Sequence, residues 1–140
     1  MKKGFLGILL GVVYLTTSSS SCNKHDHHTN PCDGAMCTAM FVMINTKVTN
    51  ATGKTILLDE AYTRRKSNNE VYRPDQTMAT YDSSYIVLDD GYLQKMQNQS
   101  DTFYFIGIKN GVKVVNEPFV ISADCCHVSK QSGKATIVIP

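Results

Sequence analysis

The residues of this chain whose types and spacing most plainly indicate chemistry are its five cysteines. Their number is odd, so at least one cysteine lacks a partner within the chain. Four of them form two groups, because Cys32 and Cys37 lie far along the chain from Cys125 and Cys126. We favour two bridges between the groups, Cys32 to one late cysteine and Cys37 to the other. The alternative is a local Cys32–Cys37 bridge with a vicinal Cys125–Cys126 bridge, which closes a strained ring.

The favoured pairing has an energetic and a geometric consequence. Each bridge closes a loop of about ninety residues, for which the chain-entropy model gives roughly 4 to 5 kcal/mol for the first bridge and less for the second. Neighbouring side chains on a regular strand point to opposite faces. Bridges from both Cys125 and Cys126 therefore require the early segment to pass around a sheet edge or a bulge at that place.

The remaining cysteine, Cys22, follows a sequence pattern typical of export. Lys2 and Lys3 precede the apolar run Phe5–Leu15, and a serine tract leads to Cys22. About eleven apolar residues suit the core of a signal peptide, whereas a membrane-spanning helix needs about 20. The pattern resembles a bacterial lipoprotein signal peptide, which predicts removal of residues 1–21 and lipid attachment at Cys22. The alternative is an ordinary secretory signal cut near the serines, which leaves Cys22 as a free thiol.

Residues 22–31 follow the signal, and they are polar and lack periodicity. We expect them to form a flexible spacer between the lipid and a folded domain. His25, His27 and His28 lie in this spacer, and imidazole groups are ligands for Zn²⁺, Cu²⁺ or Ni²⁺. A dedicated metal site holds its ligands on a rigid scaffold with supporting contacts, so the polar-tether interpretation is preferred over a metal site.

Two further clusters were considered as sites. If Cys125 and His127 share a face of a regular strand, they pair a thiol with a base, as a cysteine nucleophile requires. In an oxidising compartment the same cysteines are expected to be structural disulfides. The acidic segment Asp89, Asp90 and Gly91 offers oxygen ligands for Ca²⁺, but its spacing does not match a calcium-binding loop and turn formation explains it.

The charge balance argues against nucleic-acid binding. The chain has 14 basic and 12 acidic residues, and removal of Lys2 and Lys3 with the signal makes the two numbers equal. A nucleic-acid-binding surface requires a concentrated basic excess. The densest basic cluster is Arg64, Arg65 and Lys66, next to serine and asparagine, and it is interpreted as a solvated hairpin turn.

The rest of the chain, residues 32–140, is predicted to form a single β domain, because apolar residues alternate in short segments separated by turn residues. Val42, Ile44 and Val48 are expected on the buried face of the first strand. One short helical turn is predicted at Tyr92–Gln97. The predicted strands are Met40–Val48, Lys54–Leu58, Ala61–Arg64, Glu70–Tyr72, Met78–Tyr81, Ser84–Leu88, Thr102–Lys109, Val112–Val115, Phe119–Ala123 and Ala135–Ile139.

The strongest local signal is the dipeptide Asn110–Gly111 between two apolar runs, which predicts a hairpin with a type I′ turn. Glu117 and Pro118 are expected to interrupt the returning strand at a bulge or an edge. Seven or eight short strands with closely spaced turns predict an antiparallel β-sandwich of immunoglobulin-like or transthyretin-like type. A small β-barrel is the alternative.

The early cysteine pair and the late sequence Asp124-Cys125-Cys126-His127-Val128 resemble those of a family of small Gram-negative envelope lipoproteins with no agreed activity. The resemblance implies an outer-membrane location, facing the periplasm or the cell surface. The sequence contains no nucleophile elbow, phosphate-binding glycine loop or His-Glu-x-x-His motif. We therefore expect a noncatalytic, membrane-anchored binding or structural module with an envelope protein as partner. The rival hypothesis is a metal-binding or metal-buffering lipoprotein that uses His25, His27 and His28.

Overall fold

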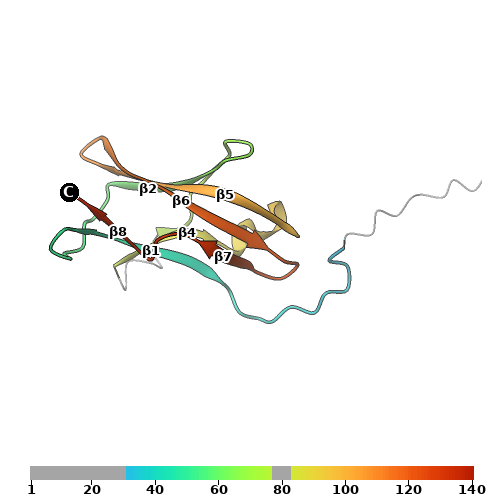
Figure 1. Ribbon diagram of the computed structural model, residues 1–140. Helices are drawn as coiled ribbons and strands as arrows, with labels where there is room; N and C mark the ends of the chain where they lie inside the picture. Colours follow the sequence, from blue (N-terminus) through green and yellow to red (C-terminus); the bar gives the residue numbers. More distant parts are fainter. Residues whose placement is uncertain (1–30, 77–82) are drawn as a thin grey trace, which may run out of the picture.

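The computed structural model describes residues 31–76 and 83–140, and these residues form a mostly β structure (Figure 1). The signal segment, Cys22, the three spacer histidines and the predicted strand Met78–Tyr81 lie outside the described residues. Within them, no helix is long and apolar enough to cross a membrane. The elements are β1 (Met43–Asn50), β2 (Glu60–Arg65), β3 (Val71–Tyr72), β4 (Ser84–Asp89), the 3₁₀ helix η3 (Asp90–Lys95), β5 (Gln99–Lys109), β6 (Val112–Ala123), β7 (Val128–Ser132) and β8 (Thr136–Ile139).

The strands form two sheets, with the order β4-β1-β8 in one and β3-β2-β5-β6-β7 in the other. The sheets are not closed into a barrel, so the sandwich prediction is confirmed and the barrel alternative is wrong. The neighbouring strands pair antiparallel, except that β1 and β8 run parallel. The first described strand therefore lies between β4 and β8, and β8 comes from the other end of the domain sequence.

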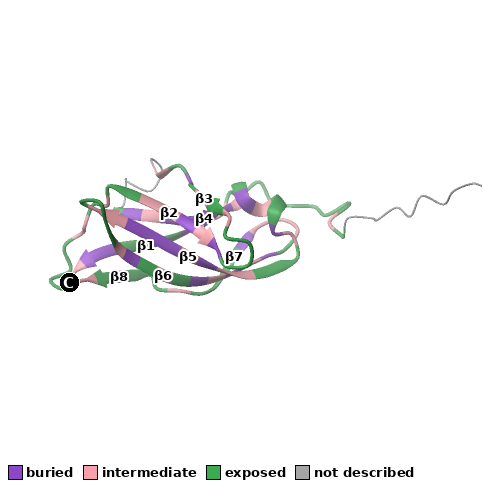
Figure 2. Ribbon diagram, turned by 90° about the horizontal axis from the view of Figure 1, so that it is seen from above, coloured by how far each residue is buried: buried purple, intermediate pink, exposed green. Residues whose placement is uncertain are grey.

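The core lies between the two sheets and is built from alternating side chains (Figure 2). In β1, Ile44 and Val48 are buried as predicted, and Thr46 lies between them on the same face. In the larger sheet, Phe103 of β5 and Phe119 of β6 are fully buried and are paired across the strands. Large aromatic side chains at paired positions account for much of the apolar area that a domain of this size needs to bury.

The predicted β5–β6 hairpin is confirmed. Asn110 and Gly111 have positive φ angles of 50° and 73°, as a type I′ turn requires. Both strands are longer than predicted, because the pairing continues from this turn to Gln99 and Ala123. The hairpin thus connects one end of the sandwich to the other.

β6 is not interrupted at Pro118, because the strand continues through it and Pro118 pairs with Tyr104, but the predicted edge is confirmed there. On its other side, β6 is paired with β7 only from Val120 onward. Proline lacks an N–H, so it is tolerated in a strand where no hydrogen bond is needed on that side. Strand β7 itself was not predicted, since Val128 is its only buried residue.

The predicted strand Lys54–Leu58 is also wrong, because in the structure this segment crosses from one sheet to the other. It forms a single β-bridge, between Thr55 and Thr49. The Ile56 N–H donates to the carbonyl of Val48 at 2.8 Å, whereas the Leu58 N–H donates to the Tyr85 hydroxyl at 2.7 Å. Backbone groups that bond to different partners in this way cannot form one continuous strand pairing.

Candidate functional site

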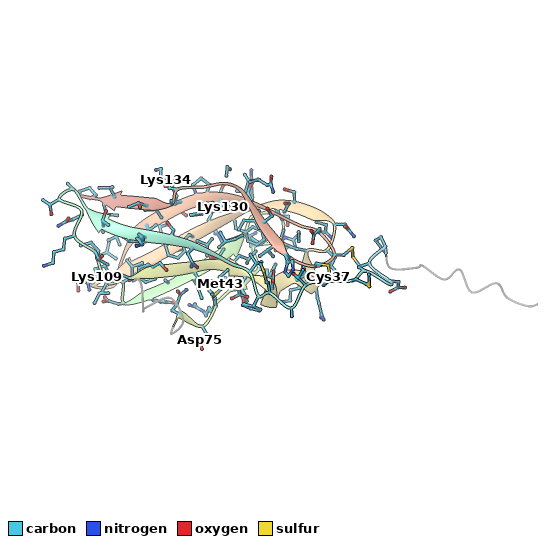
Figure 3. All side chains as sticks on the ribbon, turned by 90° about the horizontal axis from the view of Figure 1, so that it is seen from below. Cys37, Met43, Asp75, Lys109, Lys130 and Lys134 are labelled. Atoms are coloured by element: carbon cyan, nitrogen blue, oxygen red, sulfur yellow. A yellow bond between two sulfur atoms is a disulfide. The ribbon has the colours of Figure 1, made fainter. Side chains whose placement is uncertain are left out.

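The candidate site is the end of the sandwich where residues 31–42 meet the loop between β6 and β7. We call residues 31–42 the tether segment, because they precede β1 and lead toward the N-terminal part of the chain. The segment extends past the end of the two sheets in Figures 1 and 2. Figure 3 places Cys37 at this end of the molecule, away from Lys109.

Two disulfides connect the tether segment to the β6–β7 loop. Cys32 is bonded to Cys125 and Cys37 to Cys126, with Cα–Cα distances of 5.2 Å in both pairs. The favoured pairing between early and late cysteines is therefore confirmed, and the local and vicinal pairing is wrong. The tether segment cannot leave this end of the domain while either bridge is intact.

The two adjacent cysteines lie in a turn, because β6 ends at Ala123 and β7 begins at Val128. The expectation that Cys125 and His127 share a strand face is therefore wrong. The Asp124 side chain holds the turn, since its Oδ1 accepts hydrogen bonds from the N–H groups of Cys126 at 2.7 Å and His127 at 2.8 Å. These two bonds lower the pKa of the Asp124 carboxyl.

Asp90, the first residue of η3, joins the tether segment to the β6–β7 loop without a covalent bond. Its Oδ2 accepts a hydrogen bond from the Val42 N–H at 2.8 Å, and its Oδ1 accepts one from the Val128 N–H at 2.9 Å. Oδ2 is also 2.8 Å from Nδ1 of His127. Desolvation raises the pKa of the Asp90 carboxyl, but the bonds from His127, Val42 and Val128 outweigh it and the net pKa is lowered.

The connection continues to the tether segment through His127. The Oγ1 atom of Thr38 lies 2.9 Å from Nε2 of His127, and Nδ1 of the same ring faces Asp90. Hydroxyl, imidazole and carboxylate in this order are the groups of a hydrolase triad. A catalytic site also needs a cavity that holds the substrate against the hydroxyl. Thr38 is exposed at the surface, and these bonds connect the tether segment to η3 through His127.

A cavity of about 140 Å³ lies elsewhere, along β1 and β4, and is lined by Asn45, Thr46, Lys47, Ser84 and Ala135. It shares no lining residue with the Thr38, His127 and Asp90 connection. Its lining side chains are polar except for that of Ala135, and we assign no ligand to it.

The acidic segment considered for Ca²⁺ is used for backbone contacts. Asp89 accepts hydrogen bonds from the Tyr72 hydroxyl at 2.6 Å and from the Gly91 N–H at 2.8 Å, and Asp90 makes the contacts described above. Among residues 31–76 and 83–140, no three His, Cys, Asp or Glu side chains are grouped as metal ligands. The turn interpretation of this segment agrees with these contacts.

The basic cluster is the predicted solvated hairpin turn only at Lys66, which is exposed in the turn between β2 and β3, because Arg64 and Arg65 belong to β2. Arg65 is buried, and its Nε lies 2.7 Å from Asp101 Oδ2. Its other guanidinium nitrogens donate to the Lys95 carbonyl at 3.0 Å and to Gln99 Oε1 at 2.9 Å. Arg65 thereby holds the end of η3 against the start of β5, at the same end of the sandwich as the tether segment.

The site thus contains residues that the sequence singled out, namely the cysteines, His127 and Asp90, together with Thr38, which it did not. Asp90, His127 and Thr38 are far apart in sequence, and their joint role depends on the fold. Asp90 was weighed as an oxygen ligand for Ca²⁺ and interpreted as a turn residue, and His127 was weighed only as a base beside Cys125. The sequence signal for Asp90 was the acidic pair Asp89 and Asp90 before Gly91. In the structure Asp89 caps η3, and Asp90 accepts a hydrogen bond from the tether segment.

Comparisons of the chain with protein-family models, with curated proteins and with solved structures found no match.

Proposed function

We propose that this protein is a membrane-anchored envelope lipoprotein whose β-sandwich is a noncatalytic binding or structural module. Lipid at Cys22 is the proposed anchor. The observation that carries the proposal is the fastening of the tether segment to the domain by two disulfides. Because the tether segment follows Cys22 in sequence, a force between lipid and domain would pass through covalent bonds to the β6–β7 loop.

The disulfides also support an exported location. Disulfides form and persist in oxidising compartments such as the bacterial periplasm and the cell surface. Such bridges agree with the signal-like pattern of Lys2, Lys3 and the apolar run Phe5–Leu15. We place the protein at the outer membrane, facing the periplasm or the cell surface.

Mass spectrometry of protein extracted from membranes tests the anchor. The expected product begins at Cys22 and carries an acylated glycerol on its sulfur, and the Cys22→Ser variant should lack this addition. Nonreducing peptide mapping should recover the Cys32–Cys125 and Cys37–Cys126 peptides from both proteins. Wild-type protein with an unmodified residue 22 in the aqueous phase of a detergent partition would contradict the proposal.

The binding role is tested separately with the anchored protein. The loops at the end of the sandwich opposite the tether segment, including Asn110 and Gly111, are the proposed contact surface for an envelope protein. Cross-linking on intact cells followed by pull-down should enrich a partner with the wild-type protein. A variant with the residues around this hairpin turn scrambled should lose it, and equal recovery from both would argue against this surface.

A further inference from the structure

The tether segment carries three apolar side chains that the fold leaves on the surface. Met36 is 99% exposed, Met40 69% and Phe41 57%, whereas the core phenylalanines are fully buried. Residues 34–42 contain no charged side chain. A cluster of exposed methionine and phenylalanine in an uncharged segment is typical of a surface that contacts another apolar phase.

The segment is held in place before any such contact forms. The Cys37–Cys126 disulfide lies between Met36 and Met40 in the sequence, and Val42 is bonded to Asp90 directly after Phe41. Side chains on a prearranged segment lose less conformational entropy on binding than those on a free one. The three apolar residues therefore project from one segment that is held in place, and we call Met36, Met40 and Phe41 together the apolar tether surface.

The proposed lipid anchor identifies what covers this surface, and the inference rests on that proposed function. About ten residues from Cys22 to Cys32 span at most about 36 Å when fully extended. The disulfide-bonded end of the domain is thus confined close to the bilayer that holds the lipid. That bilayer is the nearest apolar phase to Met36, Met40 and Phe41.

We propose that the apolar tether surface inserts into the interface of the bilayer that carries the anchor. The absence of charged residues from 34–42 favours a zwitterionic lipid surface, since insertion is then driven by apolar burial. The lipid at Cys22 supplies the affinity for the membrane, and the apolar tether surface sets the orientation of the sandwich relative to the bilayer. The sandwich stands with the β6–β7 loop at the membrane and the Asn110–Gly111 turn about 35 Å farther away, as eleven residues of β5 imply.

Tryptophan fluorescence tests this orientation, because the chain contains no tryptophan. The Phe41→Trp variant of the full lipoprotein is purified from membranes and reconstituted into phosphatidylethanolamine and phosphatidylcholine vesicles. Its emission should be blue-shifted and roughly halved by brominated lipids, as insertion to about 5–10 Å places it in reach of them. Met40→Trp provides a second reporter on the same surface.

The matched control is Val112→Trp, since Val112 is 61% exposed and lies at the opposite end of the β5–β6 hairpin. The fluorescence of the Val112→Trp variant should not be quenched by brominated lipids. In the Phe41→Trp background, Met36→Ser together with Met40→Ser should reduce the quenching by brominated lipids.

Vesicle flotation separates the two proposals. Protein that fails to float with vesicles refutes the anchor and the inference together. Protein that floats, with Phe41→Trp and Met40→Trp both unquenched, refutes the inference alone. A blue shift of the tryptophan emission without quenching by brominated lipids would assign the apolar tether surface to a protein partner. Equal quenching of the tryptophans at positions 41 and 112 would exclude a fixed orientation. Either result would overturn the inference.

Discussion

At the residue scale, Asp90 concentrates the contacts that join three separate parts of the chain. Its carboxylate accepts from Val42 and Val128 and faces His127, and its own N–H donates to the Val42 carbonyl at 3.1 Å. A single side chain thus replaces the hydrogen bonds that a continuous sheet would otherwise supply. Its burial makes these bonds stronger than equivalent bonds at the surface.

Replacing Asp90 with alanine should destabilise the domain by about 3 kcal/mol, because two backbone N–H groups lose their acceptor. Asp90→Asn should cost less, since an amide oxygen can still accept one of the bonds. Urea unfolding followed by circular dichroism measures the difference. Equal stability of Asp90→Ala and the wild type would show that the disulfides alone hold the tether segment.

Acidic residues at this end of the sandwich also predict how stability depends on pH. Desolvation raises the pKa of Asp101, but the hydrogen bonds from Ser67 and Arg65 outweigh desolvation. The net pKa of Asp101 therefore lies below its usual value. A bond from Lys95, with a further bond from Tyr92, lowers the pKa of Glu70 to about 2. Between about pH 4 and pH 2 the unfolded chain binds more protons than the folded chain, so stability falls as pH falls.

Urea unfolding between pH 5 and pH 2 should therefore give a steadily decreasing free energy of unfolding. The Asp101→Asn variant should be less stable at pH 7, since Arg65 loses its partner, but its stability should decrease less across this range. Parallel curves for the variant and the wild type would show that Asp101 does not contribute to acid sensitivity.

At the element scale, the tether segment and the β6–β7 turn form one unit, because each disulfide joins the same two elements. With one bridge intact, the other closes a ring of only about eight residues, for which the chain-entropy model gives about 2.5 kcal/mol. The last bridge closes a loop of about ninety residues, for which the model gives roughly 4.7 kcal/mol. The stabilisation that one disulfide contributes therefore depends strongly on whether the other disulfide is intact.

Removing either bridge alone, by Cys32→Ser with Cys125→Ser or by Cys37→Ser with Cys126→Ser, should cost about 2 to 3 kcal/mol. Removing both should cost about 7 kcal/mol, more than the sum of the two separate losses. Denaturant unfolding of the three variants measures this difference. Additive losses would mean that the reduced tether segment stays in place through Asp90 and His127.

At the scale of the whole molecule, the features predicted from sequence are those that local patterns determine. Asn110–Gly111 identified its hairpin because the turn needs positive φ at two adjacent positions. The alternation in β1 identified Ile44 and Val48 as core residues. The pairing of early with late cysteines was also predicted, since the count and grouping left few arrangements, but which late cysteine bonds to Cys32 was left open.

The features that were missed depend on contacts between distant parts of the chain. Strand β7 has one buried residue, Val128, so its sequence carries little alternation. Arg65 resembles a surface residue until Asp101 and Gln99 are placed beside it. The role of Asp90 needs Val42 and Val128, which lie more than thirty-five positions away on either side of it.

The parallel pairing of β1 with β8 has a consequence for how the protein is made. During translation the residues of β1 leave the ribosome well before Ile137, which pairs with Val48. Until then the smaller sheet lacks one edge, and the cysteines at 125 and 126 have only just become accessible to their partners. The smaller sheet therefore stays incomplete until β8 has been made, and chaperones have an interval in which to bind the nascent chain.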